Sequence, residues 1–236
     1  MKSIKIGLAF ILIFCFFTTS NSTAQDAAFD ERGVAREMLL DESIRSIQFY
    51  REGWINSYPI MTVSSDLPLV LEFDELTDDV NMYSYMVIHC NANWTQSELY
   101  DQEYMTGFFE NQIENYSTSF NTYYNYTHFQ LTLPNEDISF NRSGNYMLIV
   151  YRDYDREEIV FTRRFMISEA AVGIEAKANR PVLTTFRDCC HEIDITVNTT
   201  GYRINDPFSE TTLSIYQNGV WDYEIEGLKP LFVNPG

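Results

Sequence analysis

The sequence predicts an all-β protein: an antiparallel β-sandwich of the immunoglobulin-like type, followed by a second, incomplete β-sandwich domain. Short runs rich in Val, Ile, Tyr and Phe alternate with polar residues, which is the period-two pattern of half-buried strands. These runs recur about every ten residues and are separated by Gly, Pro, Asn and Asp, as in sandwich folds. Few stretches show helical spacing.

The N-terminus has the pattern of a signal peptide, which we expect over residues 1–24. Lysines precede an apolar run of 12 residues, Ile6–Phe17, and the small residues Ser22 and Ala24 stand before the expected cleavage site. Cys15 lies inside the apolar run without the small residues of a lipoprotein motif, so acylation is not favoured. The pattern predicts an exported protein.

Composition excludes two classes of partner. The chain has 16 Lys and Arg against 34 Asp and Glu, a formal net charge of −18, whereas nucleic-acid binding needs clustered basic residues. After the signal peptide, no stretch reaches the roughly 18 apolar residues of a membrane helix. We therefore expect no nucleic acid and no direct membrane span.

Residues 25–40 form an N-terminal extension in this prediction. Their apolar residues suit a short amphipathic helix broken by Gly33. The apolar positions are Phe29, Val34, Met38 and Leu39.

The first β-sandwich is expected over residues 41–170. Its clearest element is a hairpin, in which Tyr146–Arg152 returns as Glu158–Ile167 after a charged turn, with Gly144 in the turn that precedes it. Other predicted strands contain Ile47 and Phe49; Leu69, Leu71 and Phe73 after Pro68; Met82–Cys90; and Phe129, Leu131 and Leu133.

Residues 169–173 are read as a hinge, and residues 174–236 as a second β domain. Four short strands are predicted there, with Asn218-Gly219 as a type I′ turn between the last two. Four strands leave an unpaired edge and half a core, so the sequence indicates a truncated domain. The predicted strands are 174–178, 193–197, 211–216 and 221–225.

No catalytic, cofactor-binding or metal-ligating set stands out. His89-Cys90 and Cys190-His191 are adjacent pairs, but neighbours in a strand point to opposite faces, which argues against nucleophile–base contact. Cys189, Cys190 and His191 lack zinc-knuckle spacing. Acidic runs at 72–79 and 153–158 lack EF-hand spacing, and solvated loop charge is the better interpretation. We expect no cofactor and no enzyme activity.

Three cysteines follow the signal peptide, so at least one thiol stays unpaired in a monomer. Cys90 could bridge to Cys189 or Cys190, or all three could be buried thiols, and the sequence leaves both possibilities open.

One aromatic segment suits a protein surface. Nine of the 27 residues from Tyr100 to Tyr126 are aromatic and are interleaved with Asn, Ser, Thr and Gln, in what reads as a long sandwich loop over 98–126. These rings could instead cover the core or form a glycan platform. The predicted partner-binding residues are Tyr100, Tyr104, Phe108, Tyr116, Tyr123 and Tyr124.

Several segments together resemble a known family. They are REGWINSYPIMTV, IHCNANWTQSELYDQEYMTGF, YSTSFNTYYNYTHFQLTLPNEDISFNRSGNYMLIVYRDYD and FTRRFMISEAAVGI. Their order and length make the chain similar, from about Arg51 to Ile174, to the N-terminal region of the type IX secretion system plug protein of Bacteroidetes, with further likeness through the second domain.

The resemblance implies a function and a place. It implies an exported, non-enzymatic plug that binds the outer-membrane translocon barrel on its periplasmic side and seals the idle pore. Family proteins are longer than 236 residues, so this chain would hold the N-terminal part. The resemblance carries no catalytic residue over. The alternative from another class is a secreted carbohydrate-binding β-sandwich module, which would bind soluble glycans unaided.

Overall fold

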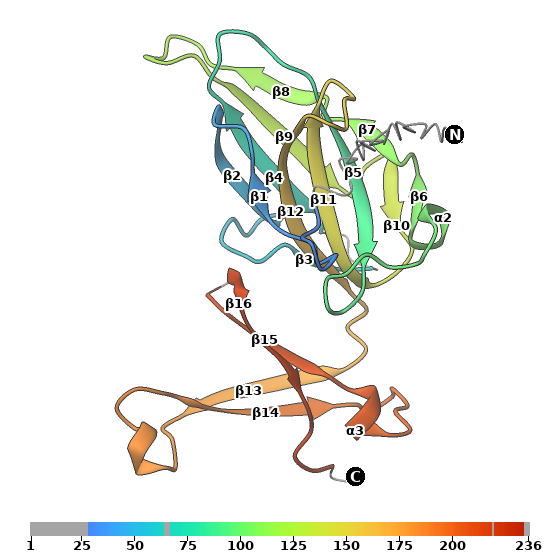
Figure 1. The fold of residues 1–236 in the computed structure, drawn as a ribbon, viewed down its shortest axis with the longest axis vertical. Helices are drawn as coiled ribbons and strands as arrows, with labels where there is room; N and C mark the ends of the chain where they lie inside the picture. Colours follow the sequence, from blue (N-terminus) through green and yellow to red (C-terminus); the bar gives the residue numbers. More distant parts are fainter. Residues whose placement is uncertain (1–27, 64–66, 219, 234–236) are drawn as a thin grey trace, which may run out of the picture.

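Two facing sheets, antiparallel except where β3 (Ile60–Thr62) pairs parallel with β12 (Ile159–Ser168), and three two-stranded sheets make up the described fold (Figure 1). The structure is a computed structural model that describes residues 28–63, 67–218 and 220–233. The predicted signal peptide lies outside the described residues. The all-β prediction is confirmed, since strands dominate and helices are a few residues long.

The two large sheets have the strand order of an immunoglobulin-like sandwich. One sheet is ordered β2-β4-β9-β8 and the other β7-β5-β11-β12, with β1 and β3 both pairing with β12. This corresponds to the A-B-E-D and C′-C-F-G pattern of that fold. The strands of the first sheet are β2 (Ile44–Arg51), β4 (Leu69–Glu75), β9 (Thr127–Leu133) and β8 (Asn115–Thr118). Those of the second are β7 (Glu110–Gln112), β5 (Tyr83–Cys90), β11 (Gly144–Arg152), β12 (Ile159–Ser168), β1 (Met38–Leu39) and β3 (Ile60–Thr62).

The hairpin predicted from the charged turn is confirmed. β11 and β12 pair antiparallel from Tyr146 opposite Phe165 to Tyr151 opposite Ile159, with an irregularity after Val150. β11 also pairs with β5 from Asn145 opposite Cys90 to Arg152 opposite Tyr83, so it lies inside its sheet.

The main core fills the space between the sheets and is strongly aromatic. Phe73 stacks on Phe129 with ring centroids 5.0 Å apart, and Tyr83 meets both rings edge-on at 5.3 and 4.9 Å. Offset and edge-on pairs are the favoured aromatic geometries and add about 0.5–1.5 kcal/mol beyond area burial.

A tyrosine corner closes the connection into β11. The Tyr146 hydroxyl donates to the backbone carbonyl of Arg142 at 2.7 Å, as is typical of immunoglobulin-like domains. Gly144 has φ +149°, and a Cβ there would lie 2.4 Å from His89 Nε2. The close approach and the positive φ explain why glycine occupies this turn.

The helix predicted for the N-terminal extension is wrong over its described part. From Ala28 the chain makes a turn with isolated bridges, in which Phe29 pairs with Ala35 and Val34 with Thr95, and it then forms β1. A turn replaces the helix because Gly33 adopts a left-handed φ of +72° and the Asp30 carboxylate accepts backbone bonds from Arg32 and Val34.

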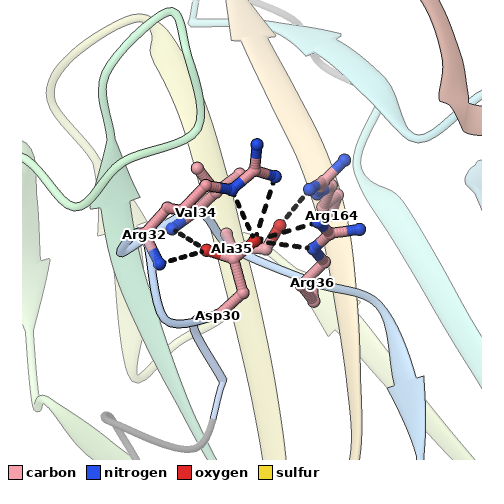
Figure 2. A network of polar contacts seen from close by, with 6 residues as sticks. All are labelled: Asp30, Arg32, Val34, Ala35, Arg36 and Arg164. Carbon is pink, nitrogen blue, oxygen red and sulfur yellow. Dashed lines mark hydrogen bonds and ion pairs between the residues drawn. The ribbon is translucent and has the colours of Figure 1, made fainter.

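Asp30 is the centre of a polar network that holds this turn (Figure 2). Its Oδ1 accepts from the backbone nitrogens of Arg32 and Val34 at 2.9 and 3.0 Å, and its Oδ2 receives the guanidinium of Arg36 at 2.9 Å and that of Arg32 at 3.2 Å. The backbone bond from Val34, followed by the bond from Arg36, holds the pKa of Asp30 well below its usual value.

Arg164 fastens the same segment to the outer face of the β12 sheet. It is buried, and it donates from Nη2 to the Ala35 carbonyl (Figure 2). Its Cζ lies 4.7 Å from the Trp94 ring centre. Its backbone nitrogen donates to Glu37 Oε1 at 2.9 Å. A second core, containing Ala28 and Ala35, therefore lies on the face of the sheet opposite the main core.

The four strands predicted over residues 174–225 are confirmed, and among the described residues they pair only with one another. The buried hydrophobic residues of the described chain all come from 28–167, so these strands add no second large core there. Gly219 of the predicted Asn218-Gly219 turn lies outside the described residues. The elements are β13 (Gly173–Asn179), η1 (Thr184–Phe186), β14 (Glu192–Asn198), α3 (Pro207–Glu210), β15 (Leu213–Gln217) and β16 (Val220–Leu228).

The β15–β16 hairpin contacts the second core of the first domain. Trp221 meets Trp94 edge-on at 5.0 Å, and its Nε1 donates to Glu37 Oε1 at 3.0 Å. Trp94 Nε1 donates to the Tyr216 hydroxyl at 3.4 Å. The N-terminal segment and the C-terminal hairpin thus share one aromatic contact region.

Replacing Arg164 tests the anchoring of the N-terminal segment. Arg164→Met removes the donor to the buried Ala35 carbonyl and the cation over Trp94, so we expect the free energy of unfolding to fall by about 2 kcal/mol or more. Urea denaturation followed by tryptophan fluorescence measures it. Arg32→Met is the control from the same network, and because Arg32 is exposed its effect should stay within about 0.5 kcal/mol. If the two substitutions lowered the free energy of unfolding equally, Arg164 would not be the residue that anchors the N-terminal segment.

The Asp30 network predicts a pH dependence. Because the folded pKa of Asp30 lies below its unfolded value, its contribution to stability is fully present above about pH 4 and declines as the pH falls from there toward the folded pKa. The melting temperatures of wild type and Asp30→Asn should therefore differ most at pH 6, and the difference should narrow steadily as the pH falls from about 4 to about 2. A gap between the two melting temperatures that stays constant over this range would refute the role of the carboxylate.

Candidate partner-binding surface

The aromatic segment is not a long loop, which corrects the sequence prediction. It folds into α2 (Asp101–Tyr104), β6 (Met105–Gly107), β7 and β8. β6 pairs with β10 (Ile138–Phe140), β7 with β5, and β8 with β9. Polar residues hid these strands because they bury little: β6 and β7 each bury one residue, and all four residues of β8 are exposed.

Tyr104 belongs to the core, so its predicted role as a partner contact is wrong. It is 2% exposed, and its hydroxyl donates to Asp101 Oδ1 at 2.9 Å and to the Val87 carbonyl at 3.1 Å. It is the last residue of α2, and this single helical turn directs its ring onto the sandwich. The other five predicted residues are exposed.

The exposed candidates do not form one patch. Tyr100 precedes α2 and Phe108 follows β6, on the right-hand edge of the sandwich in Figure 1. Tyr116, Tyr123 and Tyr124 belong to β8 and to the connection from β8 to β9, which projects at upper left. Tyr116 lies half-exposed, 5.7 Å from the buried ring of Phe129.

The connection from β8 to β9, residues 119–126, is here called the aromatic tip. Phe120 is 94% exposed, Tyr123 91% and Tyr124 72%, and the two tyrosine rings meet edge-on at 4.9 Å. Phe120 was missing from the predicted set, although its place between Ser119 and Asn121 in a polar turn points to solvent. Soluble proteins expose clustered large rings chiefly at interaction sites.

Hydrogen bonds fix the backbone of the aromatic tip. Ser119 N donates to the Tyr126 carbonyl at 2.8 Å, and Tyr126 N donates back to Ser119 Oγ at 2.9 Å. Thr122 Oγ1 donates to the Tyr124 carbonyl at 2.7 Å. Asn125 Nδ2 donates to Asp78 Oδ1 at 2.9 Å and so ties the tip to the β4–β5 loop. A fixed backbone lowers the entropy cost of presenting these rings.

Further exposed apolar residues lie in that β4–β5 loop, namely Leu76, Val80 and Met82. Asp153 N donates to the Met82 carbonyl at 3.0 Å, which joins the β11–β12 turn to the same end of the domain. In Figure 1 this end is opposite to β13–β16. The end therefore combines apolar side chains with the acidic residues of the two connections.

An open hollow of about 420 Å³ lies at the base of the aromatic tip. Its lining includes Tyr126, Ser117 and the pair formed by His128 Nδ1 and Asp74 Oδ1 at 2.8 Å. A tyrosine beside hydroxyl and carboxylate groups is chemistry that also suits a sugar, so this hollow is the place to test the carbohydrate alternative.

A second hollow, of about 350 Å³, contains a serine–histidine pair. His89 Nδ1 lies 2.9 Å from Ser97 Oγ and Nε2 lies 3.3 Å from the Ser143 carbonyl, so Nε2 donates and Nδ1 accepts. Burial lowers the pKa of His89, and the ring packs edge-on against Tyr146 at 5.0 Å. These contacts join β5 to two loops, so we interpret the pair as structural.

The described cysteines do not form a catalytic pair with a histidine. Cys90 is buried, and Cys189 and Cys190 are exposed. Cys90 is buried in the second core, whereas His89 packs on Tyr146 of the main core, so the two neighbours do point to opposite faces as predicted. Burial raises the pKa of the Cys90 thiol to about 12. Within the described ranges, no three His, Cys, Asp or Glu side chains gather as a metal site.

Fold and surface define a β-sandwich with an exposed aromatic tip. Residues 44–169 match the family described as the type 9 secretion system plug protein 1st domain. The chain belongs to this family. Its members are structural, non-catalytic components of the secretion machinery in the cell envelope.

A solved structure supports the same fold. The chain is similar to a hypothetical protein from Parabacteroides merdae, with 28% identity and a TM-score of 0.77 over 84% of this chain. The chain spans 50% of the length of that protein. The search of curated proteins found no match. In the described part of the chain, no helix has the length and apolar character needed to cross a bilayer.

Alanine substitutions separate core rings from surface rings. Tyr104→Ala should lower the free energy of unfolding by about 3 kcal/mol or more, because it empties a buried site and leaves Asp101 without its donor. Tyr123→Ala should change it by less than about 0.5 kcal/mol. Chemical denaturation of both variants checks this, and a destabilised Tyr123→Ala would place the aromatic tip in the core.

Proposed function

We propose that this chain is a non-enzymatic, exported plug that binds the outer-membrane translocon barrel of the type IX system from the periplasm and seals the idle pore. The observation that carries the proposal is the plug-domain match over 44–169, together with the exposed aromatic tip. Family membership supports a place in the secretion machinery, and the geometry of the tip supports direct contact with a protein.

The size of the aromatic tip suits an interface. Three fully buried rings would cover roughly 450–750 Å², at about 150–250 Å² each. A standard interface buries about 800 Å² on each partner. Phe120, Tyr123 and Tyr124 are therefore sufficient in area to form the centre of the contact, and the adjacent residues Leu76, Val80 and Met82 extend it.

The charge of this end predicts the character of the partner surface. Asp78 and Asp79 lie in the β4–β5 loop and Asp153 and Asp155 in the β11–β12 turn, around the apolar residues. A polar rim of one sign favours a partner of opposite sign, because facing like charges cost several kcal/mol. The barrel surface that receives the tip should be basic around an apolar centre.

Sealing also requires a plug that does not deform. The tip extends directly from β8 and β9, which pair from Tyr116 opposite Phe129 to Thr118 opposite Thr127. Phe129 is part of the main core, so a force on the tip is transmitted to the sandwich. A rigid sandwich needs no catalytic group to block a pore.

Binding to the purified barrel tests this function. Phe120→Ala, Tyr123→Ala and Tyr124→Ala should each raise the dissociation constant about thirtyfold, which corresponds to about 2 kcal/mol for an interface anchor. Phe108→Ala is the matched control, because it removes an equally exposed ring away from the tip. Biolayer interferometry with the barrel in detergent measures all four, alongside thermal unfolding to verify the fold.

A cell-level assay addresses sealing. Deleting the gene should increase uptake of a large hydrophilic antibiotic. Re-expressing the wild-type gene should restore the barrier, whereas the gene with all three alanine substitutions should not. The carbohydrate-binding alternative replaces the plug if the chain does not bind the barrel but binds soluble glycans. In that case His128→Ala, which alters the hollow, should abolish glycan binding.

A further inference from the structure

Two adjacent cysteines, Cys189 and Cys190, lie in the connection between β13 and β14. Their sulfur atoms are 2.9 Å apart, within about 1 Å of the length of an S–S bond. Both side chains are exposed, unlike Cys90. The pair is thus accessible to reagents and is already arranged for its two sulfurs to react with each other.

We propose that Cys189 and Cys190 form a reversible redox site, at which a disulfide donor closes a bond between the two neighbouring sulfurs. The donor is a small or protein disulfide of the kind that exported proteins meet in the cell envelope. The site is independent of the aromatic tip, so it can exist whether or not the chain seals a pore.

The connection that holds the cysteines is braced at both ends. Val182 N donates to Glu192 Oε2 at 2.9 Å, and Arg187 Nε donates to the Pro181 carbonyl at 3.2 Å. Cys190 N donates to the Phe186 carbonyl at 3.0 Å, which continues the turn of η1. These bonds restrict the backbone around the pair, so the short sulfur–sulfur separation is built into the loop.

The reaction is two successive exchanges with a donor RSSR. The thiolate of one cysteine attacks a donor sulfur, and the donor S–S bond breaks. RS⁻ leaves, and a mixed disulfide between the cysteine and the other half of the donor remains. The neighbouring thiolate then attacks the cysteine sulfur of that mixed disulfide and expels the second RS⁻. The two thiol protons end on two RSH molecules, and two electrons pass from the cysteines to the donor.

Closure between neighbours produces a bond that is easily reduced. Adjacent Cα atoms are about 3.8 Å apart across a trans peptide, whereas disulfides usually span about 4.4–6.8 Å between Cα atoms. The closed ring is therefore strained, and strained, exposed disulfides belong to the labile class. This makes the site reversible. Cys90 takes no part, since it is buried among Met86, Ile88 and Trp94.

Mass spectrometry of the chain from Gln25 onward tests the proposal. Oxidised glutathione, with EDTA present, should lower the intact mass by about 2 Da, and peptide mapping should assign the bond to Cys189–Cys190. Cys189→Ser and Cys190→Ser should each stop at the mixed disulfide, a gain of about 305 Da. Reduced glutathione should reopen the wild-type bond without denaturant.

Four outcomes would overturn the proposal. They are a wild-type chain that stays unreacted, one that stops at the glutathione adduct, a bond that maps to Cys90, and a closed bond that reduced glutathione does not open. Alkylation checks the fold in every sample, because Cys90 should be modified only after unfolding.

Discussion

The structure depends on one constraint: the central strands β5 and β11 are buried on both faces and mostly apolar. All eight residues of β5 are buried, and so are Tyr146–Tyr151 of β11. An antiparallel sheet usually leaves one face in water, so the second face here needs a cover. The N-terminal turn supplies it with Ala28 and Ala35, Arg164 fastens it, and Trp221 extends it from the other end of the chain.

The same core determines where large rings are exposed. Because both faces of β5 and β11 are occupied, the large exposed rings occur at the edge β8 and at the connections beyond the sheets. The aromatic tip is continuous with β9, whose Phe129 stacks on Phe73 in the main core. The aromatic tip is rigid because its base is part of the core. Rigidity favours an interface anchor, because less entropy is lost on binding.

Period-two patterning was enough to predict the sandwich, the β11–β12 hairpin and the later strands, since alternation reports directly on burial. The pattern failed where contacts between distant parts of the chain determine the local structure. The helical spacing of residues 28–39 reflects a turn around Asp30 that packs on a sheet far away in sequence, as Arg164 demonstrates. Composition alone likewise could not separate Tyr104 from Tyr123, because one helical turn at α2 buries the first and a hairpin connection exposes the second. The sulfur contact of Cys189 and Cys190 needed coordinates.

The central claim, that the aromatic tip enters the translocon barrel, is tested most directly by site-specific photo-crosslinking in cells. A photoreactive phenylalanine analogue is placed at Tyr123, and in a separate strain at Tyr202, an exposed ring after β14. Irradiation should join the chain to the barrel from position 123 and not from position 202. Two results would contradict the account. One is a barrel adduct from position 202 alone, and the other is no barrel adduct from position 123 in cells where the chain and the barrel co-purify.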